Sequence, residues 1–435
     1  MNMNIASSMR SKLVRMILVL VVAGSSLGLQ AGVPKTAAAD KPIFKDISKH
    51  WAKSTIESMA GTGILNGYSD GTFRPDDPIQ VDEFIKILIM SLTEKTKYEK
   101  LPVFWKEKVW NRFDPLDQRA YSEKFGYWNF QPAAKGYWAQ TYIDVANEIF
   151  LVFAEKFYNY KANVKREEAA RIIFHTLNSI EFTEEESYSR RATWGYKDIP
   201  KLDDNGKKYA GETMTKGIMS GYDTKYFGVG KLVTRAEALT IIQRLNDSTK
   251  RKPVKIDLTN VPHVIAPIYF NMYKRVEILA TNKMKLAYDK FVEIGSKNSK
   301  ELSSLNSTAI RMFKDKEAKE YYLSRKNSFE IFKYEASLSV FPSNNSYAAS
   351  IYIKDNDSWR RQEKSFEDFF VYLLGETQGK LILSEMETAA KKMQEKSIES
   401  NYSKDLGVYL LTVGSKTGNT INNVSFILSE KTKGA

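Results

Sequence analysis

The stretch of sequence that says most about the fold reads Val233-Thr234-Arg235-Ala236-Glu237-Ala238. Thr234 and Glu237 have the spacing of a capping box, in which the hydroxyl and the carboxylate each accept a backbone N–H at the start of a helix. A helix is therefore predicted to begin after Thr234. Apolar residues follow at helical spacing and predict one buried face: Ala238, Ile241, Ile242 and Leu245.

The same succession of elements occurs three times along the chain. The unit that ends in the quoted stretch opens with Tyr196-Lys197-Asp198-Ile199 and passes through Tyr209-Ala210 and the turn at 217–223. An aligned first unit runs from Phe44-Lys45-Asp46-Ile47 through His50-Trp51-Ala52 to Gln80-Val81-Asp82-Glu83-Phe84. A plainer middle unit contains Tyr137-Trp138-Ala139 and Val164-Lys165-Arg166-Glu167-Glu168-Ala169. Each unit reads as helix, glycine-rich loop, helix.

Three such units resemble the S-layer-homology (SLH) domain of Gram-positive and related bacteria. The resemblance covers residues 42 to about 247 and is fullest from Val233 to Glu237. It implies a mainly α-helical pseudo-trimer with a central bundle of helices. It also implies that grooves between the units bind an anionic, commonly pyruvylated, secondary cell-wall polysaccharide.

The N-terminal residues have the order of a secretory signal peptide. Arg10, Lys12 and Arg15 precede an apolar run over residues 16–22, and small residues end at Ala39. The apolar run is shorter than the roughly 20 residues of a membrane span, so we expect export and no transmembrane segment in the mature chain. The predicted signal peptide holds four basic residues and no acidic ones, so the net charge of +13 becomes 13 − 4 = +9 in the mature chain, which suits an acidic wall polymer. Nucleic acid is not expected as a partner, because export and the lack of an aromatic-interleaved basic stripe argue against it.

Together these features predict a multidomain chain. The expected parts are a signal peptide (1–39), SLH repeat 1 (40–92), an inserted loop region (93–136), SLH repeat 2 (137–182), SLH repeat 3 (183–249), a linker (250–260) and an α+β domain of unknown role (261–435).

The resemblance assigns the anionic polymer to arginines at helix starts. Arg235 follows the capping Thr234, where free N–H groups and the positive end of the helix dipole also favour an anion, and a guanidinium adds a two-pronged donor. Arg166 has the matching place in the middle unit. The first unit has Val81 there, which cannot pair with an anion, so a site in that unit would need Arg74 or a nearby lysine. The alternative for each arginine is an exposed charge with no specific role.

Aromatic residues supply a second set of candidates. The loops Gly67-Tyr68 and Gly221-Tyr222 could place tyrosine rings against the apolar face of a sugar, or the rings could be half-buried parts of a turn. Trp51 and Trp138 are candidates for the same contact, and the competing interpretation places them in the core.

Residues 261–435 follow a different pattern. Apolar spacing predicts a long helix over residues 268–294, and alternation predicts strands at 329–340 and 349–353 with a turn at 342–345. A helix broken near Gly375 and Gly379 is expected at 365–398, followed by strands at 408–413 and 424–428.

Catalytic and metal-binding motifs are lacking. The chain has no cysteine, and its three histidines, His50, His175 and His263, have no metal-ligand spacing. Glu385 and Glu387 lie two residues apart on a predicted helix and would point in different directions. Residues 70–77 lack the spacing of a calcium loop. No cofactor, metal or catalytic residue is predicted.

The predicted function is therefore non-covalent anchoring at the bacterial cell wall through SLH repeats, with a C-terminal binding or structural domain displayed outside. Two alternatives remain open at this point: a self-assembling S-layer subunit and an anchored wall or glycan hydrolase. The sequence does not reveal the role of the C-terminal domain or the oligomeric state.

Overall fold

The structure is a computed structural model that describes residues 44–95, 103–113, 118, 137–148, 159–268, 272–324, 334–395, 401–416 and 422–431. The predicted signal peptide and much of the predicted inserted region lie outside these residues.

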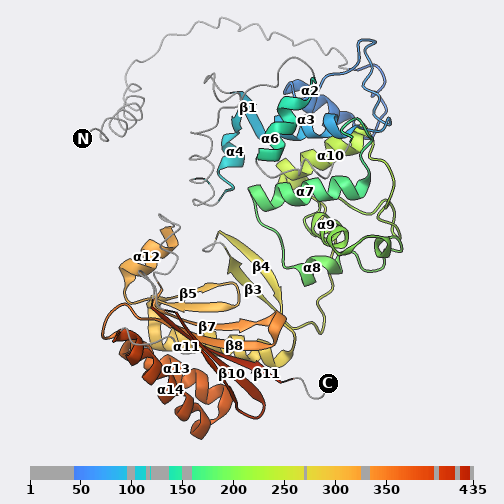
Figure 1. The fold of residues 1–435 in the computed structure, drawn as a ribbon. Helices are drawn as coiled ribbons and strands as arrows, with labels where there is room; N and C mark the ends of the chain where they lie inside the picture. Colours follow the sequence, from blue (N-terminus) through green and yellow to red (C-terminus); the bar gives the residue numbers. More distant parts are fainter. Residues whose placement is uncertain are drawn as a thin grey trace, which may run out of the picture. The chain divides into compact units, whose positions relative to one another are not determined.

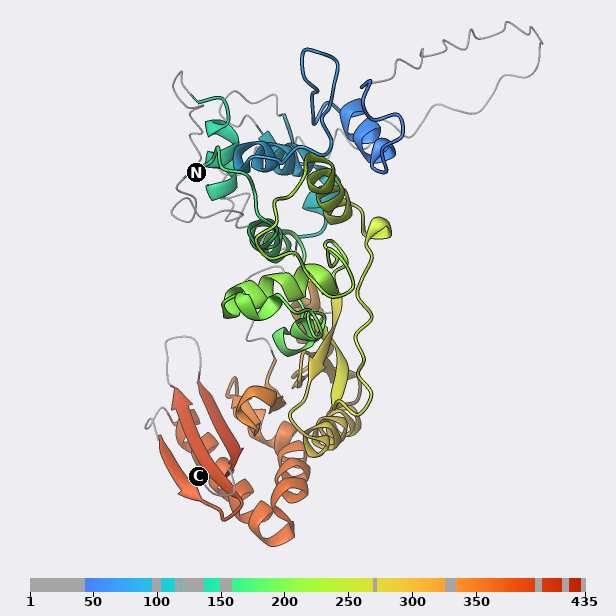
Figure 2. The same cartoon turned by 90° about the vertical axis from the view of Figure 1, so that its right-hand side faces the viewer.

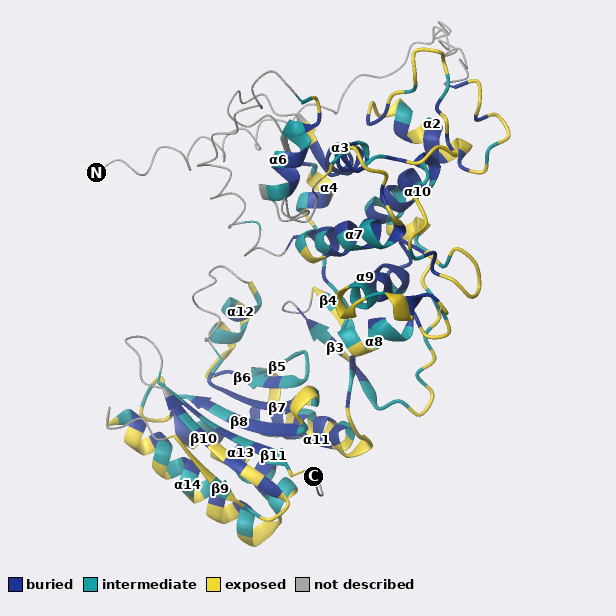
Figure 3. Cartoon of the chain, turned by 45° about the vertical axis from the view of Figure 1, so that its right-hand side comes forward, coloured by how far each residue is buried: buried dark blue, intermediate teal, exposed yellow. Residues whose placement is uncertain are grey.

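Three long helices start at equivalent positions of the three predicted units: α3 (Val81–Leu92), α7 (Arg166–Ile180) and α10 (Arg235–Asn246) (Figure 1). In each, the carboxylate of the third helical residue accepts the N–H of the residue before the helix, over 2.8 to 3.2 Å. The Thr234 hydroxyl also accepts the N–H of Glu237 at 3.2 Å. The predicted helix start after Thr234 is therefore confirmed. Each of these three helices carries many buried positions (Figure 3).

A closed ring of backbone hydrogen bonds joins the residues just before the three helices. Ile79 donates to the carbonyl of Val233 at 3.0 Å, Val233 to Val164 at 2.8 Å, and Val164 to Ile79 at 2.9 Å. All three side chains are fully buried. A buried N–H must find an acceptor, and here each unit supplies the acceptor for another unit.

A shorter helix opens each unit: α2 (Lys53–Gly61), α6 (Gln140–Glu148) and α9 (Asp204–Thr215). Helix α2 packs on α10, α6 on α3, and α9 on α7. The first helix of each unit therefore packs on the long helix of a different unit. The other described elements of this region are β1 (Thr93–Lys95), β2 (Val103–Trp105), α4 (Glu107–Trp110), α8 (Glu186–Arg191), η2 (Ile199–Lys201) and η3 (Ser248–Lys250).

The start of the predicted linker is held against the middle and third units. The guanidinium of Arg251 donates to both oxygens of Glu181 at 3.0 and 2.8 Å, and both side chains are largely buried. The N–H of Lys252 donates to the carbonyl of Gly217 at 2.8 Å. Arg112 also pairs with Glu181. Arg251 and Lys252, which lie in the predicted linker, therefore make structural contacts with the repeats.

Glu212 lies beside this ion-pair cluster and is buried. Its two carboxylate oxygens accept the N–H of Glu184 at 3.0 and 3.1 Å. Burial raises the pKa of Glu212 to about 7, against the opposing effects of the Lys216 ammonium and the Glu184 N–H. Between about pH 4.5 and 7 the Glu212 carboxyl group is therefore protonated in the folded chain and ionised in the unfolded chain.

We expect Glu212→Gln to stabilise the chain at pH 8 and to change little at pH 5. Because the folded-state pKa is raised, the stability contributed by Glu212 is lost as pH rises from about 4.5 through 7. Glutamine does not ionise, so the variant keeps its stability over this pH range. The expected gain at pH 8 is about 1 to 2 kcal/mol. Urea unfolding of both proteins at the two pH values measures it, and an equal difference at pH 5 and pH 8 would contradict it.

The C-terminal region is built on a seven-stranded antiparallel sheet with the order β5-β6-β7-β8-β11-β10-β9. Its strands are β5 (Ser303–Asn306), β6 (Ala309–Met312), β7 (Ala336–Phe341), β8 (Ser346–Tyr352), β9 (Tyr402–Asp405), β10 (Tyr409–Lys416) and β11 (Asn423–Glu430). Helices α11 (Asn282–Ser299), α13 (Ser358–Leu374) and α14 (Glu376–Gln394) pack on this sheet (Figures 1 and 2). Its other elements are α12 (Lys316–Ser324), η4 (Lys300–Leu302) and η6 (Pro342–Asn344).

The predicted helix over residues 268–294 is wrong in its first half. This region forms a hairpin of β3 (His263–Ile268) and β4 (Tyr273–Ile278), and α11 begins only after Thr281, whose hydroxyl accepts the N–H of Met284 at 3.1 Å. The sequence predicts a helix here because the apolar residues of β4 also fit helical spacing. The predicted helix break at Gly375 is confirmed, with φ of 81°, whereas a break at Gly379 is wrong because this glycine lies inside α14 (Glu376–Gln394).

The remaining C-terminal predictions are largely confirmed. Strands occur at β8, β10 and β11, while the part of the predicted strand at 329–333 lies outside the described residues. Glu385 pairs with Lys404 and Glu387 with Lys391, as expected of surface charges. Within the described residues, no helix combines the length and the apolar character needed to cross a membrane.

Candidate functional site

Arg166 is a buried connection between the middle and third units. Its Nε donates to the carbonyl of Phe227 at 2.8 Å, and one terminal nitrogen donates to the carbonyl of Ser220 at 2.7 Å. The other terminal nitrogen lies 3.5 Å from Glu237. The side chain is only 7% exposed. Most of its donor capacity is used by the protein itself.

Arg235 makes the equivalent connection from the third unit to the first. Its Nε donates to the carbonyl of Phe73 at 3.0 Å, and a terminal nitrogen pairs with Glu83 at 2.9 Å. This side chain is also 7% exposed. The two predicted anion-binding arginines are thus placed alike, and both face a neighbouring unit.

The expectation that free N–H groups at the start of α10 receive an anion is wrong. The N–H of Arg235 donates to the carbonyl of Asp77 and that of Ala236 to the carbonyl of Pro75, both at 2.9 Å. The N–H of Glu237 is taken by Thr234. Two of these N–H groups are not free to bind a ligand because carbonyl groups of the first unit lie at the start of α10 and accept from them.

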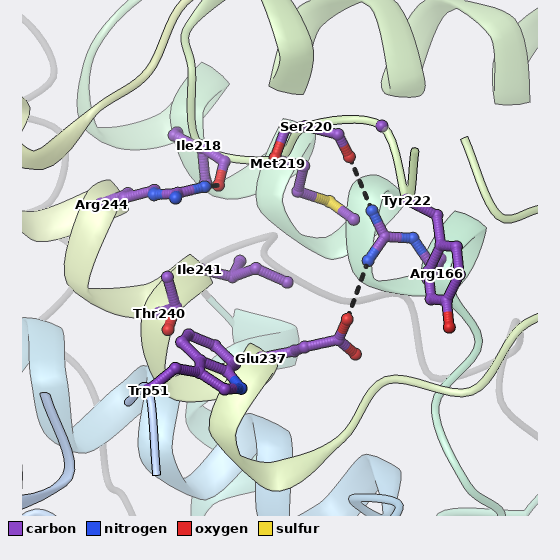
Figure 4. A pocket seen from close by; sticks show the side chains of 11 residues that line it. Trp51, Arg166, Ile218, Met219, Ser220, Tyr222, Glu237, Thr240, Ile241 and Arg244 are labelled. Carbon is purple, nitrogen blue, oxygen red and sulfur yellow. Dashed lines mark hydrogen bonds and ion pairs between the residues drawn. The ribbon is translucent and has the colours of Figure 1, made fainter. Parts of the chain in front are cut away.

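A cavity of about 200 Å³ lies where residues of all three predicted units meet (Figure 4). It contains four of the predicted site residues, and Arg166 and Glu237 form one side of it. The full lining is Trp51, Arg166, Ile218, Met219, Ser220, Gly221, Tyr222, Glu237, Thr240, Ile241 and Arg244. We call this cavity the Trp51 pocket.

The interpretation that Trp51 and Trp138 belong to the core is wrong. Their side chains are 63% and 53% exposed, whereas the following residues, Ala52 and Ala139, are buried. Both alanines belong to the hydrophobic core of the N-terminal region, and the tryptophan beside each of them is exposed. Tyr222, which is 53% exposed, adds a second aromatic ring to the Trp51 pocket.

A related cluster surrounds Arg235. Its guanidinium carbon lies 5.1 Å from the ring centroid of Tyr68, and that of Arg74 lies 3.9 Å from the same ring. Lys86 lies 5.6 Å from the ring of Trp138. Arg74 pairs with Asp70 at 3.1 Å and is partly exposed. Gly67 precedes Tyr68 in a tight approach to Phe44, where a Cβ would not fit.

The third equivalent position has no arginine at the helix start. Val81 is buried there, and its N–H donates to the carbonyl of Ala162 at 2.9 Å. A cavity of about 410 Å³ lies along α7 and α9, lined by Glu167, Glu168, Arg171, His175, Leu202, Asp203, Asn205, Gly206 and Tyr209. Burial, with the charges of Arg171 and Lys208, lowers the pKa of His175 to about 4. Its imidazole is therefore neutral near pH 7.

The S-layer homology domain family model matches residues 43–80 and 195–239. The chain carries S-layer homology domains. The first match ends just before α3 and the second includes the start of α10, so they fall on the first and third predicted units. The middle unit is not matched, and its assignment as a repeat stays a prediction that rests on the equivalent placement of Val164 and Arg166.

Three relatives, all from Acetivibrio thermocellus, are similar to parts of the chain. A cellulosome-anchoring protein is 27% identical over 184 residues, covering 38% of this chain and 35% of that protein. Exoglucanase XynX is 22% identical over 218 residues, covering 50% and 17%. Cell surface glycoprotein 1 is 35% identical over 57 residues, covering 13% and 2%. The chain spans about a third or less of the length of these relatives. The S-layer homology matches, with the anchoring and cell-surface relatives, support a location at the cell wall or cell surface.

Sequence reasoning missed the part of the pocket that α10 contributes. Thr240, Ile241 and Arg244 follow Glu237 at intervals of three, four and seven residues and so share one helix face. That spacing is visible in the sequence, but the capping role of Glu237 gave no sign that this face borders a cavity.

Proposed function

We propose that the chain anchors non-covalently to the bacterial cell wall by binding an anionic, pyruvylated secondary cell-wall polysaccharide in the Trp51 pocket. The observation that carries the proposal is the pocket itself. Two exposed aromatic rings, Trp51 and Tyr222, stand beside convergent polar groups at a junction of three units. Aromatic rings with nearby polar groups suit a sugar, which has both an apolar face and hydroxyls.

The rigidity of the pocket supports binding. Arg166 is fixed by two backbone carbonyls and Glu237, and Glu237 also caps α10. A site whose walls are already ordered loses little conformational freedom when a ligand enters. The S-layer homology matches and the cellulosome-anchoring relative support anchoring at the cell surface rather than catalysis for this part of the chain.

The arrangement of the units supports a pseudo-trimer. The closed hydrogen-bond ring of Ile79, Val164 and Val233, and the cyclic packing of α2, α6 and α9 on α10, α3 and α7, repeat one contact three times. The proposed domain limits are those predicted from the sequence. A second proposed site lies around Arg235, with contributions from Gly67, Tyr68, Arg74 and Trp138.

Trp51→Ala is expected to weaken binding of the full chain to purified wall polysaccharide by about tenfold or more, the usual cost of removing a central aromatic side chain. Calorimetry measures the affinity. Trp194→Ala is the matched control, because Trp194 is 67% exposed but lies outside the pocket lining. Equal losses in the two variants, or no loss with Trp51→Ala, would contradict the proposed site.

A further inference from the structure

We infer that Arg244, rather than Arg166 or Arg235, pairs with the acidic group of the polysaccharide and makes the Trp51 pocket selective for acidic over neutral sugar. This inference rests on the proposed function and names the residue that decides its specificity. It reassigns the role that the sequence pattern gave to the arginines at the helix starts.

The two helix-start arginines are poor candidates because their charges are already compensated. Arg166 faces Glu237 and two carbonyls, and Arg235 faces Glu83 and one carbonyl. A ligand carboxylate that reached either guanidinium would compete with a protein carboxylate for the same donors. It would also have to approach the negative charge of that carboxylate.

Arg244 is in the opposite situation. Its side chain is half-buried and lines the Trp51 pocket. The guanidinium donates to the carbonyl of Ile218 at 3.3 Å, and within the described residues no carboxylate lies in ion-pair range of it. Burial lowers its pKa, because the charged form loses contact with water. A cation that is partly desolvated and lacks a counter-charge gains strongly from an anionic ligand.

The two sides of the Trp51 pocket differ in charge. Arg244 and Arg166 lie on opposite sides of it, with Glu237 on the side of Arg166 (Figure 4). An acidic substituent on a sugar that stacks on Trp51 therefore has one favourable direction, toward Arg244. Glu237 on the other side repels an acid placed the wrong way.

Equivalent positions on the other long helices cannot do the same. Counting seven residues from the capping glutamate gives Met90 on α3, His175 on α7 and Arg244 on α10. Methionine carries no charge, and His175 is neutral near pH 7 with a pKa of about 4. Among these three equivalent positions, only the one in the Trp51 pocket holds a permanent cation.

Two forms of one polymer test the inference: wall polysaccharide with its pyruvate ketals intact, and the same material after mild acid removes the ketals. Calorimetry on the full chain compares wild type, Arg244→Gln, Arg244→Lys and the control Arg190→Gln, whose guanidinium pairs with Glu186 outside the pocket. We expect Arg244→Gln to lose about tenfold affinity for the ketal form and none for the neutral form. Arg244→Lys should keep most of the preference, and Arg190→Gln all of it.

The outcomes separate the two proposals. If Arg244→Gln keeps the wild-type preference for the ketal form, this inference is overturned. Wild-type protein that binds both forms equally, with binding that still depends on Trp51, would also overturn it; wall anchoring through the Trp51 pocket would stand, but the pyruvate ketal would no longer be part of the ligand recognised. Wild-type protein that binds neither form would overturn the proposed function as well.

Discussion

Arg235→Ala is expected to lower the free energy of unfolding by about 2 to 4 kcal/mol. The change leaves the carbonyl of Phe73 without its donor and the carboxylate of Glu83 without its cation. Removal of one partner from a buried ion pair costs about 3 to 5 kcal/mol, and the expected loss is smaller because Glu83 is 29% exposed and can be partly solvated. Urea unfolding followed by circular dichroism measures the loss.

Arg74→Ala is the matched control for this variant. Arg74 belongs to the same cluster around Tyr68, but its charge is exposed and its pair with Asp70 lies on the surface. Surface pairs of this kind contribute little to stability because water and salt screen them, so we expect Arg74→Ala to unfold close to the wild-type urea concentration. If Arg235→Ala unfolds at the wild-type urea concentration, the buried connection between the first and third units contributes nothing to stability.

This result bears on how binding measurements with arginine variants are interpreted. A sequence pattern that places an arginine at a helix start suggests a ligand contact, and a loss of binding in Arg235→Ala would be read as its confirmation. In the structure the same loss follows from weakened contact between units. Only a variant that binds worse while keeping its stability identifies a ligand contact, so the unfolding of Arg244→Gln should be measured beside its affinity.

Local features of the fold could be predicted because they depend on neighbouring residues. The Thr234 and Glu237 capping box and the turn at Gly375 each act within a few residues, and both occur where the sequence predicts them. The outward direction of Trp51 could not be predicted in this way. It depends on the tertiary packing that buries Ala52 in the core and leaves the adjacent Trp51 exposed.

Local sequence patterns also could not predict the directions of the arginine side chains. The carbonyl partner of Arg166, at Phe227, is 61 residues away, and that of Arg235, at Phe73, is 162 residues away. Which unit meets which is decided by the ring of Ile79, Val164 and Val233. Residue spacing within one unit carries no information on which unit contacts which. The residue types of the candidate site could therefore be predicted from the sequence, but the partners of their side chains in other units could not.

The C-terminal region provides the second large expected effect, at Arg361. Glu335 is fully buried, and the Arg361 Nε donates to both of its carboxylate oxygens at 3.1 Å. Gln362 donates to the same carboxylate at 2.9 Å. The pair joins the start of β7 to α13, so it connects the sheet to the helical layer that covers it.

We expect Arg361→Ala to cost about 3 to 5 kcal/mol of unfolding free energy, because it leaves the carboxylate of Glu335 buried and unpaired. Adding Glu335→Gln should recover part of that loss, since the glutamine is neutral and can still accept from Gln362. Arg360→Ala is the matched control, because Arg360 is the adjacent residue and is exposed. Urea unfolding of the four proteins measures these differences. A double variant that is less stable than Arg361→Ala alone would show that the cost comes from lost packing rather than from the uncompensated charge.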